Sequence, residues 1–258
     1  MGIETAISWT DSTFNPWWGC TRVGPGCGDD TGGGCYAEIF ANRYGHQIWG
    51  PGAPRRTFGE KHWNEPRKWN AAAARTGQQH KVFCASMADV FDNEAPAGER
   101  ERLWALIRET PHLTWQIVTK RIGNAKKMLP ADWGDGYDNV WLLATMVNQD
   151  EVGRDMEKLL DTPARIHGIS GEPLLGQMDV RPYLRAIPGK RKALDWVIVG
   201  GESGPHAREM PEAWALDLRD QCEEAGTAFF YKQKGGTGRD KGGSLLAGRE
   251  YKAWPVAA

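Results

Sequence analysis

The sequence predicts an α/β fold, a partial or closed parallel β/α barrel formed by a single domain over residues 1–258, and three observations support this prediction. Short apolar, β-branched runs alternate with longer amphipathic stretches along the chain, which is typical of a parallel sheet covered by helices. Polar and charged residues follow nearly every apolar run, as they do at the functional rim of such a barrel. The length of 258 residues fits six or seven β/α units, and no stretch resembles an interdomain linker.

Each predicted element follows from its local pattern. Apolar, β-branched runs predict strands at residues 7–9, 81–85, 114–119, 140–146, 165–170, 196–199 and 228–231. Amphipathic spacing predicts helices at 36–44, 64–79, 97–109, 122–128, 150–161 and 211–225, with a weak helical pattern at 178–187. Pro211 and Gly226 flank the last helix in the positions that these residue types favour at helix ends. The Gly-rich segment 235–248 is expected to be a flexible loop.

Composition and charge exclude several classes of protein. Apolar residues make up 40% and charged residues 25% of the chain, which is ordinary for a globular protein. No apolar run approaches the roughly 20 residues that a membrane span needs, and the acidic, polar N-terminus does not resemble a signal peptide. We therefore expect no membrane partner and a cytoplasmic location. The net charge of −1 argues against a long footprint on duplex DNA, so any contact with nucleic acid is expected to be local.

Three of the five cysteines, Cys20, Cys27 and Cys35, fall within a short glycine-rich loop at 17–38. An odd number of cysteines in a chain without an export signal argues against a disulfide framework. Glycine and proline allow a loop to fold tightly, so that several thiolates can converge. Three thiolates can bind three irons of a [4Fe–4S] cluster and leave the fourth iron open to S-adenosylmethionine (SAM), whose reductive cleavage releases a 5′-deoxyadenosyl radical.

Two other interpretations of these cysteines remain open. Zinc is the first, because His46 could complete a set of three cysteines and one histidine, although structural zinc sites usually show paired, shorter spacings. In the second, the three cysteines are unrelated buried residues. The remaining two, Cys84 in a predicted strand and Cys222 on an apolar helix face, are expected to be small core residues.

Residues that follow the predicted strands are candidates for binding the cofactor, because the chemistry of a β/α barrel lies at the carboxyl ends of its strands. Ser86 and Asp89 are placed to bind the amino group or the ribose of SAM. Thr145 and Asn148 are placed to bind its ribose or adenine. For each single residue, the alternative is that it is polar only because the strand leaves the core there.

Charged residues at three further strand ends are candidates for catalysis and anion binding. Lys120 and Arg121 form the best candidate site for an anion, which could be a carboxylate or a phosphate; the alternative is a solvated basic turn. Glu172 and Glu202 each follow a glycine and could bind a substrate amine or a ribose hydroxyl. We take Lys120, Glu172 and Glu202 as candidate catalytic residues and Arg121 as a cofactor-binding residue.

Several motifs together resemble a known family. They read ISWTD at 7–11, NPWWGC at 15–20, PGC at 25–27, CYAE at 35–38, VTKR at 118–121, GEPLLG at 171–176 and VGGESG at 199–204. In order and content they are similar to a phage-associated three-cysteine family, usually labelled only as a phage protein or a domain of unknown function. That family looks like a branch of the radical SAM superfamily, related in style to DNA photoproduct lyases. Some of its phage members are associated with thymidine hypermodification in viral DNA, in which an amino-acid adduct on the base is rearranged.

The cysteine spacing departs from the pattern of that family. The family has two residues between its second and third cysteines, whereas seven residues separate Cys27 from Cys35. The CxxxCxxC spacing common among radical SAM enzymes is not met either. The number of cysteine ligands is unchanged by this difference. The resemblance further implies that Tyr36, which directly follows Cys35, stacks on the adenine of SAM.

These observations favour a radical SAM enzyme of the isomerase or lyase type, with a [4Fe–4S] cluster and SAM as cofactors. The resemblance implies that its substrate is an amino-acid-modified thymidine in phage DNA, and that it acts in the host cytoplasm with an electron donor such as flavodoxin or ferredoxin. Two alternatives remain. One is a zinc or iron–sulfur module that recognises nucleic acid without catalysis, for which the 13 tryptophans offer flat contact surfaces. The other is a repair enzyme similar to a DNA photoproduct lyase.

Overall fold

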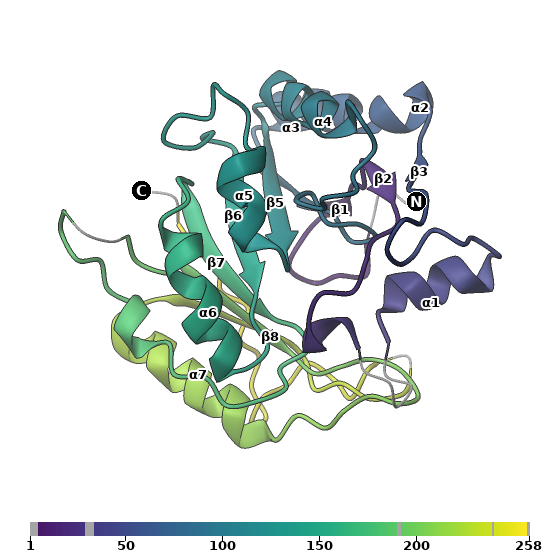
Figure 1. Cartoon of the computed structure of the whole chain (residues 1–258). Helices are drawn as coiled ribbons and strands as arrows, with labels where there is room; N and C mark the ends of the chain where they lie inside the picture. The colour runs from purple at the N-terminus through teal and green to yellow at the C-terminus, as the bar shows by residue number, and fades with distance from the viewer. Residues whose placement is uncertain (1–4, 29–33, 190–191, 239, 257–258) are drawn as a thin grey trace. The chain divides into compact units, whose positions relative to one another are not determined.

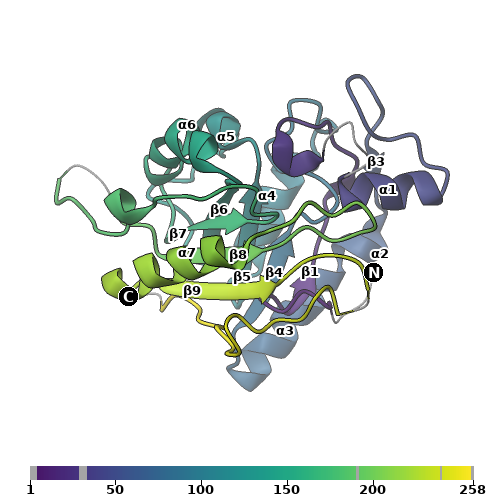
Figure 2. The same cartoon turned by 90° about the horizontal axis from the view of Figure 1, so that it is seen from below.

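The structure, a computed structural model, describes residues 5–28, 34–189, 192–238 and 240–256. Within these residues the main sheet has seven strands in the order β1-β4-β5-β6-β7-β8-β9, which can be followed in Figures 1 and 2. Each strand lies beside the strand of this sheet that precedes it in the chain, and the described pairings are parallel. This is the strand order of a partial parallel β/α barrel, so the predicted fold class is confirmed. The strands are β1 Ser12–Thr13, β4 His80–Cys84, β5 Leu113–Thr119, β6 Val140–Thr145, β7 Ile166–Gly171, β8 Trp196–Gly200 and β9 Ala228–Gln233.

Helices occupy the stretches between most of these strands. They are α1 Tyr36–Arg43, α2 Glu60–Trp63, α3 Glu65–Thr76, α4 Glu99–Glu109, α5 Ile122–Met128, α6 Gln149–Leu160 and α7 Glu212–Ala225. The predicted end of the last helix is confirmed, because Gly226 caps α7 in the left-handed conformation that glycine adopts without strain. None of the described helices has the length and apolar character needed to cross a membrane.

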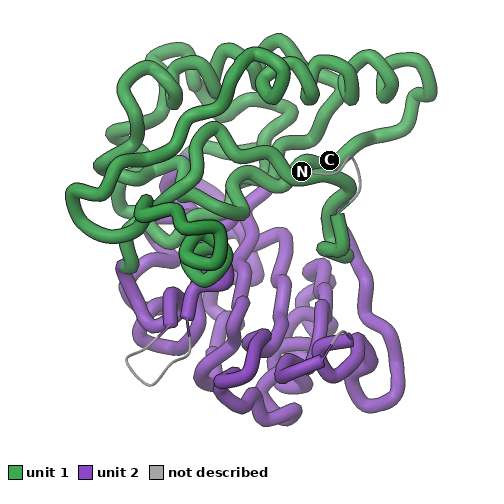
Figure 3. The backbone as a smooth tube through the Cα atoms, turned by 90° about the vertical axis from the view of Figure 1, so that its right-hand side faces the viewer, with its two compact units in different colours: residues 1–22, 37–142, 163–165 green, residues 23–36, 143–162, 166–258 purple. Residues whose placement is uncertain are grey.

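The chain divides into two compact units, drawn in different colours in Figure 3. Unit 1 comprises residues 1–22, 37–142 and 163–165, and unit 2 comprises residues 23–36, 143–162 and 166–258, each as far as its residues are described. The boundary passes through the cysteine loop, so Cys20 belongs to unit 1 whereas Cys27 and Cys35 belong to unit 2.

Unit 1 has a core of apolar strand residues covered by helices. β4 pairs with both β1 and β5, and Val82, Trp115 and Ile117 on these strands are fully buried. α3 packs against β4 and β5, and α4 packs against α3. A two-stranded antiparallel sheet of β2 (Trp17–Trp18) and β3 (Arg56–Thr57) was not predicted.

Gly19 directly follows β2 and can be no other residue without a shift of the backbone. Its φ is +123°, and a Cβ at this position would lie 2.4 Å from the carbonyl oxygen of Ile48. The amide of Gly19 donates to the carbonyl of Met87, just past β4. The close approach therefore brings the segment that carries Cys20 against the end of β4.

Unit 2 repeats the parallel arrangement with β7, β8 and β9. α7 packs against β8 and β9, and its buried face includes Leu218 and Cys222. The register between β8 and β9 shifts at Gly200, where both strands end. Cys84 in unit 1 and Cys222 in unit 2 are both fully buried, as expected for core residues.

Two predicted elements are wrong. Residues 7–9 form a turn, and the first strand lies at Ser12–Thr13 instead. Trp9 is buried in the core, where its ring lies 4.8 Å from that of Phe83. The strand prediction was wrong because a buried apolar residue outside a strand gives the same sequence signal as one inside a strand. The weak helical pattern at 178–187 corresponds only to the single 3₁₀ turn at Arg181–Tyr183.

The Gly-rich segment that follows β9 is hydrogen-bonded to the end of β8. The amide of Gly236 donates to the carbonyl of Glu202 (2.7 Å), and the amide of Gly201 donates to the carbonyl of Gln233 (3.0 Å). A Cβ on Gly201 would lie 1.9 Å from the carbonyl oxygen of Lys234, so glycine is required for this contact. The expected flexibility of the segment 235–248 stays a prediction.

Stability should depend on pH through His167, which lies on β7. Burial lowers the pKa of His167, and its Nε2 lies 2.7 Å from the carbonyl oxygen of Thr162. Because the unfolded chain binds a proton first, the free energy of unfolding should fall as pH drops below about 6.5, by at most about 1.4 kcal/mol per pH unit. In urea titrations, His167→Gln should remove this part of the pH dependence and leave stability above pH 7 nearly unchanged. An identical dependence in both proteins would contradict the assignment.

Candidate functional site

The ends of β4 and β5 in unit 1 are joined by the carboxylate of Asp89. One oxygen of Asp89 accepts hydrogen bonds from the hydroxyl of Thr119 (2.7 Å) and the amide of Phe91 (2.9 Å), and the other accepts from the amide of Lys120 (2.9 Å). Burial raises the pKa of Asp89, and these three hydrogen bonds oppose the rise. The carboxylate of Asp89, which was expected to bind SAM, thus fixes the backbone at Lys120 and Arg121.

Ser86, the other candidate beyond β4, contacts the N-terminal motif. The side-chain amide of Asn15 donates to Ser86 Oγ (3.1 Å), and its carbonyl accepts from the amide of Met87 (2.7 Å). Asn15 is fully buried. The motif 15–20 is therefore held at the carboxyl edge of β4 by one asparagine side chain.

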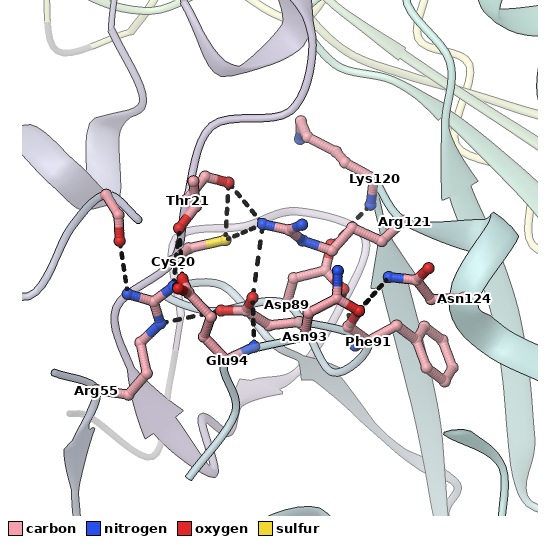
Figure 4. A network of polar contacts seen from close by, with 12 residues as sticks. Cys20, Thr21, Arg55, Asp89, Phe91, Asn93, Glu94, Lys120, Arg121 and Asn124 are labelled. Carbon is pink, nitrogen blue, oxygen red and sulfur yellow. Dashed lines mark hydrogen bonds and ion pairs between the residues drawn. The ribbon is translucent and has the colours of Figure 1, made fainter. Parts of the chain in front are cut away.

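A buried arginine that the sequence analysis did not select, Arg55, organises the loops around Cys20. Its Nε donates to Asp92 Oδ2 (3.0 Å), and its Nη2 donates to Thr21 Oγ1 (2.8 Å) and Glu94 Oε2 (2.7 Å). Its Nη1 donates to the carbonyls of residues 50 and 53. Figure 4 shows the guanidinium at the centre of these contacts. One side chain therefore joins the cysteine segment, the loop before β3 and the loop after β4.

Arg121 contacts Cys20 from the end of β5. Its Nη2 lies 3.9 Å from Cys20 Sγ, donates to the carbonyl of Thr21 (2.8 Å) and lies 3.6 Å from Asp92 Oδ1. The Arg121 side chain is 10% exposed, and its Nε is buried without a hydrogen-bond partner among the described residues. The side chain of Lys120 extends away from this cluster in Figure 4.

The environment of Cys20 disfavours a bare thiolate. Burial, followed by the nearby carboxylate of Asp89, raises the pKa of the Cys20 thiol to about 12, whereas Arg121 opposes the rise. At neutral pH the sulfur therefore keeps its proton unless a bound cation replaces it. A metal centre is the kind of cation that deprotonates a buried thiol in this way.

In unit 2 the backbone brings Cys27 and Cys35 together in spite of the seven residues between them. The amide of Cys35 donates to the carbonyl of Cys27 (3.1 Å), and Gly28 forms a β-bridge with Gly34. Cys27 ends the 3₁₀ turn Pro25–Cys27 (η1), and Tyr36 begins α1 with 57% of its surface exposed. The middle of the longer spacing, residues 29–33, lies outside the described residues.

The remaining candidates of unit 2 lie at strand ends, as predicted. Thr145 is the last residue of β6 and is buried. Asn148 caps α6, because its side-chain oxygen accepts from the amide of Glu151 (3.0 Å). Both residues are therefore close in the chain to the point where β6 passes into α6.

Both glutamates pair with cations. Glu172 Oε1 lies 2.7 Å from Lys232 Nζ, and its Oε2 accepts from Ser170 Oγ (3.2 Å). Glu202 makes a bidentate pair with Arg208, with N–O distances of 2.8 and 2.6 Å. Burial and the charge of Lys232 lower the pKa of the neighbouring Lys241, which Glu172 partly offsets. Both acids are thus neutralised by cations within unit 2.

The structure brings some of the predicted site residues together within each unit. Unit 1 gathers Cys20, Asp89 and Arg121, and unit 2 gathers Cys27 with Cys35. Across the described part of the chain, no group of three or more histidine, cysteine or acidic side chains is close enough to hold a metal ion. Convergence of all three cysteines therefore stays a prediction.

Sequence reasoning missed Arg55 and Asp92, and only Asp92 carried a signal. Asp92 follows Asp89 by three residues beyond the same strand, so the motif could have been read as a pair of acids. Arg55 lies in a Pro- and Gly-rich stretch beside Arg56, which is typical of a solvated loop. A hollow of about 820 Å³ in unit 1 lies at the opposite, amino end of β5, where Thr114 and His112 line it, and it holds none of the candidate residues.

Comparison with known proteins gives a family. A family model described as a protein of unknown function (DUF5131) matches residues 4–255. Searches of curated proteins and of solved structures found no match to the chain.

The Arg55 cluster should contribute strongly to stability. Arg55→Ala would leave the buried Asp92 with one longer ion pair to Arg121 and a hydrogen bond from the amide of Glu94, and the loss of one partner of a buried ion pair costs about 3–5 kcal/mol. Arg67→Ala is the matched control, because the Arg67–Glu109 pair is about half exposed and should contribute at most about 1 kcal/mol. Urea unfolding monitored by circular dichroism measures both. Equal effects in the two variants would show that Arg55 has no special role.

Proposed function

The chain belongs to the DUF5131 family of unknown function, and from this premise and the geometry around Cys20 we propose that it is a radical SAM enzyme. In this proposal Cys20, Cys27 and Cys35 bind a [4Fe–4S] cluster. The observation that carries the proposal is the half-buried cysteine at the carboxyl edge of a parallel sheet with an arginine N–H group 3.9 Å from its sulfur. Donors to sulfur are a main means by which proteins stabilise and tune iron–sulfur clusters.

A hydrogen-bond donor beside Cys20 fits an anionic group such as an iron–sulfur cluster or SAM. Arg121 Nε is a buried donor without a described partner, and an unsatisfied buried donor costs about 1–3 kcal/mol. An anionic ligand beside Cys20, such as cluster sulfide or the carboxylate of SAM, would satisfy it. The high pKa of Cys20 is also consistent with a thiol that ionises only when it binds metal.

The backbone of unit 2 supports the other two ligands. The hydrogen bond between Cys35 and Cys27 makes their residues neighbours, so the long spacing does not by itself separate the two thiols. Tyr36 is exposed at the start of α1, directly after Cys35. In the proposal its ring stacks on the adenine of SAM.

When bound, the cluster and SAM supply a 5′-deoxyadenosyl radical, with an electron from a donor such as flavodoxin or ferredoxin. The chain's own residues bind and orient. Arg121 and Lys120 offer positive charge to a carboxylate or phosphate, and Ser86, Thr145 and Asn148 are assigned to the polar groups of SAM. Asp89 holds the backbone amide of Lys120 in place.

The substrate proposed from the resemblance is a thymidine in DNA that carries an amino-acid-like adduct. An adduct of this kind has an amine and a carboxylate. The pairs Glu172–Lys232 and Glu202–Arg208 have the matching charges, so a substrate amine can exchange for the cation and a carboxylate for the acid. The net charge of −1 is consistent with contact to one base and a few phosphates rather than to a long duplex.

Removal of any one cluster ligand should abolish the cluster. Protein purified without oxygen should be brown and contain about four irons per chain. Cys20→Ala, Cys27→Ala and Cys35→Ala should each lose the colour and most of the iron, measured by absorption and metal analysis. Cys222→Ala is the control, because this cysteine is a buried core residue, and it should keep the iron. Stoichiometric zinc without iron after anaerobic reconstitution would contradict the proposal.

Reaction with DNA tests the substrate. Reconstituted protein with SAM, a strong reductant and DNA from the host virus should release 5′-deoxyadenosine, or exchange label with it, and should change the nucleoside profile measured by mass spectrometry. Glu202→Gln should reduce the change while iron content and SAM binding stay intact. If SAM is cleaved but the nucleosides never change, the DNA substrate is wrong and the radical chemistry stands.

A further inference from the structure

We propose that the outward face of α1, together with Arg56, binds single-stranded DNA beside Cys20. This surface, the α1 surface, consists of Ile39, Phe40, Arg43, Tyr44, His46 and Arg56, all in unit 1. The inference deepens the proposed function, on which it rests for the choice of DNA among nucleic acids.

The helix α1 exposes its large apolar side chains instead of burying them. Ile39, Phe40 and Tyr44 are 47%, 40% and 61% exposed, whereas the small residues Ala37 and Ala41 are buried. Phe40 and Tyr44 are four residues apart and therefore share a face of the helix. Their ring centroids lie 4.7 Å apart in an edge-on arrangement. Exposed aromatic rings in a group are more typical of a binding surface than of an ordinary solvated helix.

Positive charge surrounds these rings. Arg43 and Arg56 are both exposed, and no carboxylate among the described residues forms an ion pair with either. The two acids nearest in the sequence are already paired, Glu38 with Arg22 and Glu60 with Arg102. A chain of net charge −1 thus presents a local surface that combines aromatic rings with free positive charge.

The rings and cations form one connected group. Trp18 lies 5.7 Å from Phe40 and 5.0 Å from His46, measured between ring centroids. The guanidinium of Arg56 lies 5.8 Å from the ring of Trp18, and its Nη1 donates to Nε2 of His46 (2.9 Å). Cys20 follows Trp18 by two residues. The α1 surface is therefore continuous with the segment that carries the proposed cluster ligand.

Single-stranded nucleic acid fits this combination better than a protein partner does. Bases stack on aromatic side chains whatever their sequence, and cations follow the phosphate backbone. An acidic protein could contact both the arginines and the rings, so an acidic polypeptide is included below as a competitor; only a nucleic acid strand offers flat bases and phosphates in regular alternation. Duplex DNA hides its bases, so a strand that is already open, or a base that is extruded for reaction, is the form expected here.

Fluorescence anisotropy with the full-length chain and a labelled single strand of about ten nucleotides tests the inference. Tyr44→Ala and Phe40→Ala should each weaken binding roughly tenfold, and Tyr44→Trp should restore it. The double variant Arg43→Gln, Arg56→Gln should lower the slope of log affinity against log salt by about 1.4, since each phosphate contact on a single strand contributes about 0.7. Circular dichroism checks that each variant is folded.

Matched substitutions outside the α1 surface are the controls. Leu245→Ala removes a side chain that is 56% exposed, and Arg75→Gln removes an exposed cation on α3; neither should change binding. The inference is wrong if the α1 variants bind like the unmodified chain, if polyglutamate competes as well as the oligonucleotide does, or if Tyr44→Ala only dissociates a dimer. Iron content, measured on the same preparations, distinguishes failure of this inference from failure of the proposed function. A chain that holds iron and SAM but does not bind the oligonucleotide contradicts DNA binding at the α1 surface and leaves the proposed function intact.

Discussion

The arrangement of unit 1 around Cys20 depends on the ion pairs and hydrogen bonds of one buried guanidinium, that of Arg55. It satisfies Asp92, a side chain that is 1% exposed, and donates in addition to Thr21, Glu94 and the carbonyls of the loop before β3. Desolvation makes a buried ion pair a weak source of net stability, and its clearest effect is that removing one partner is costly. Its structural consequence is specificity: three loops that have no regular secondary structure in common are held in a single arrangement.

That arrangement determines the electrostatics of the sulfur. Asp89 and Asp92 are both buried near Cys20, and both raise the pKa of its thiol, whereas Arg121 opposes the rise. Arg55 neutralises Asp92 from one side, and Arg121 approaches both Asp92 and the sulfur from the other. A cation that binds the sulfur would therefore enter a region with three acids, Asp89, Asp92 and Glu94, and two arginines.

Local sequence patterns predicted the repeating part of the fold well, because strands and helices of a β/α architecture are specified by burial and periodicity within a few residues. β5, β6 and α5 lie within a residue of the predicted bounds. The N-terminal strand was misplaced because Trp9 is buried by contact with Phe83 and not by pairing within a strand. The small sheet of β2 and β3 was not predicted because its pairing joins Trp17 to Thr57, and neither two-residue segment has a periodicity of its own.

The candidate site was predictable to the extent that it lies at strand ends. Asp89, Arg121, Glu172 and Glu202 are found there because residues beyond parallel strands share one edge of a sheet. Which side chain pairs with each of them, as Arg208 does with Glu202, depends on tertiary contacts that no local pattern encodes.

In the proposed function, ion pairing also explains how a chain of near-zero net charge would recognise a charged substrate. Acids at the strand ends are neutralised by Lys232 and Arg208, so a ligand would bind there by exchanging one ion pair for another and would gain specificity rather than raw attraction. On α1 the situation is reversed, because Arg43 and Arg56 have no described acid beside them. Long-range attraction to a polyanion would therefore act at α1, and discrimination between substrates would take place at the strand ends. Since attraction between exposed charges is screened beyond about 10 Å at moderate salt, the two roles can be separated experimentally by ionic strength alone.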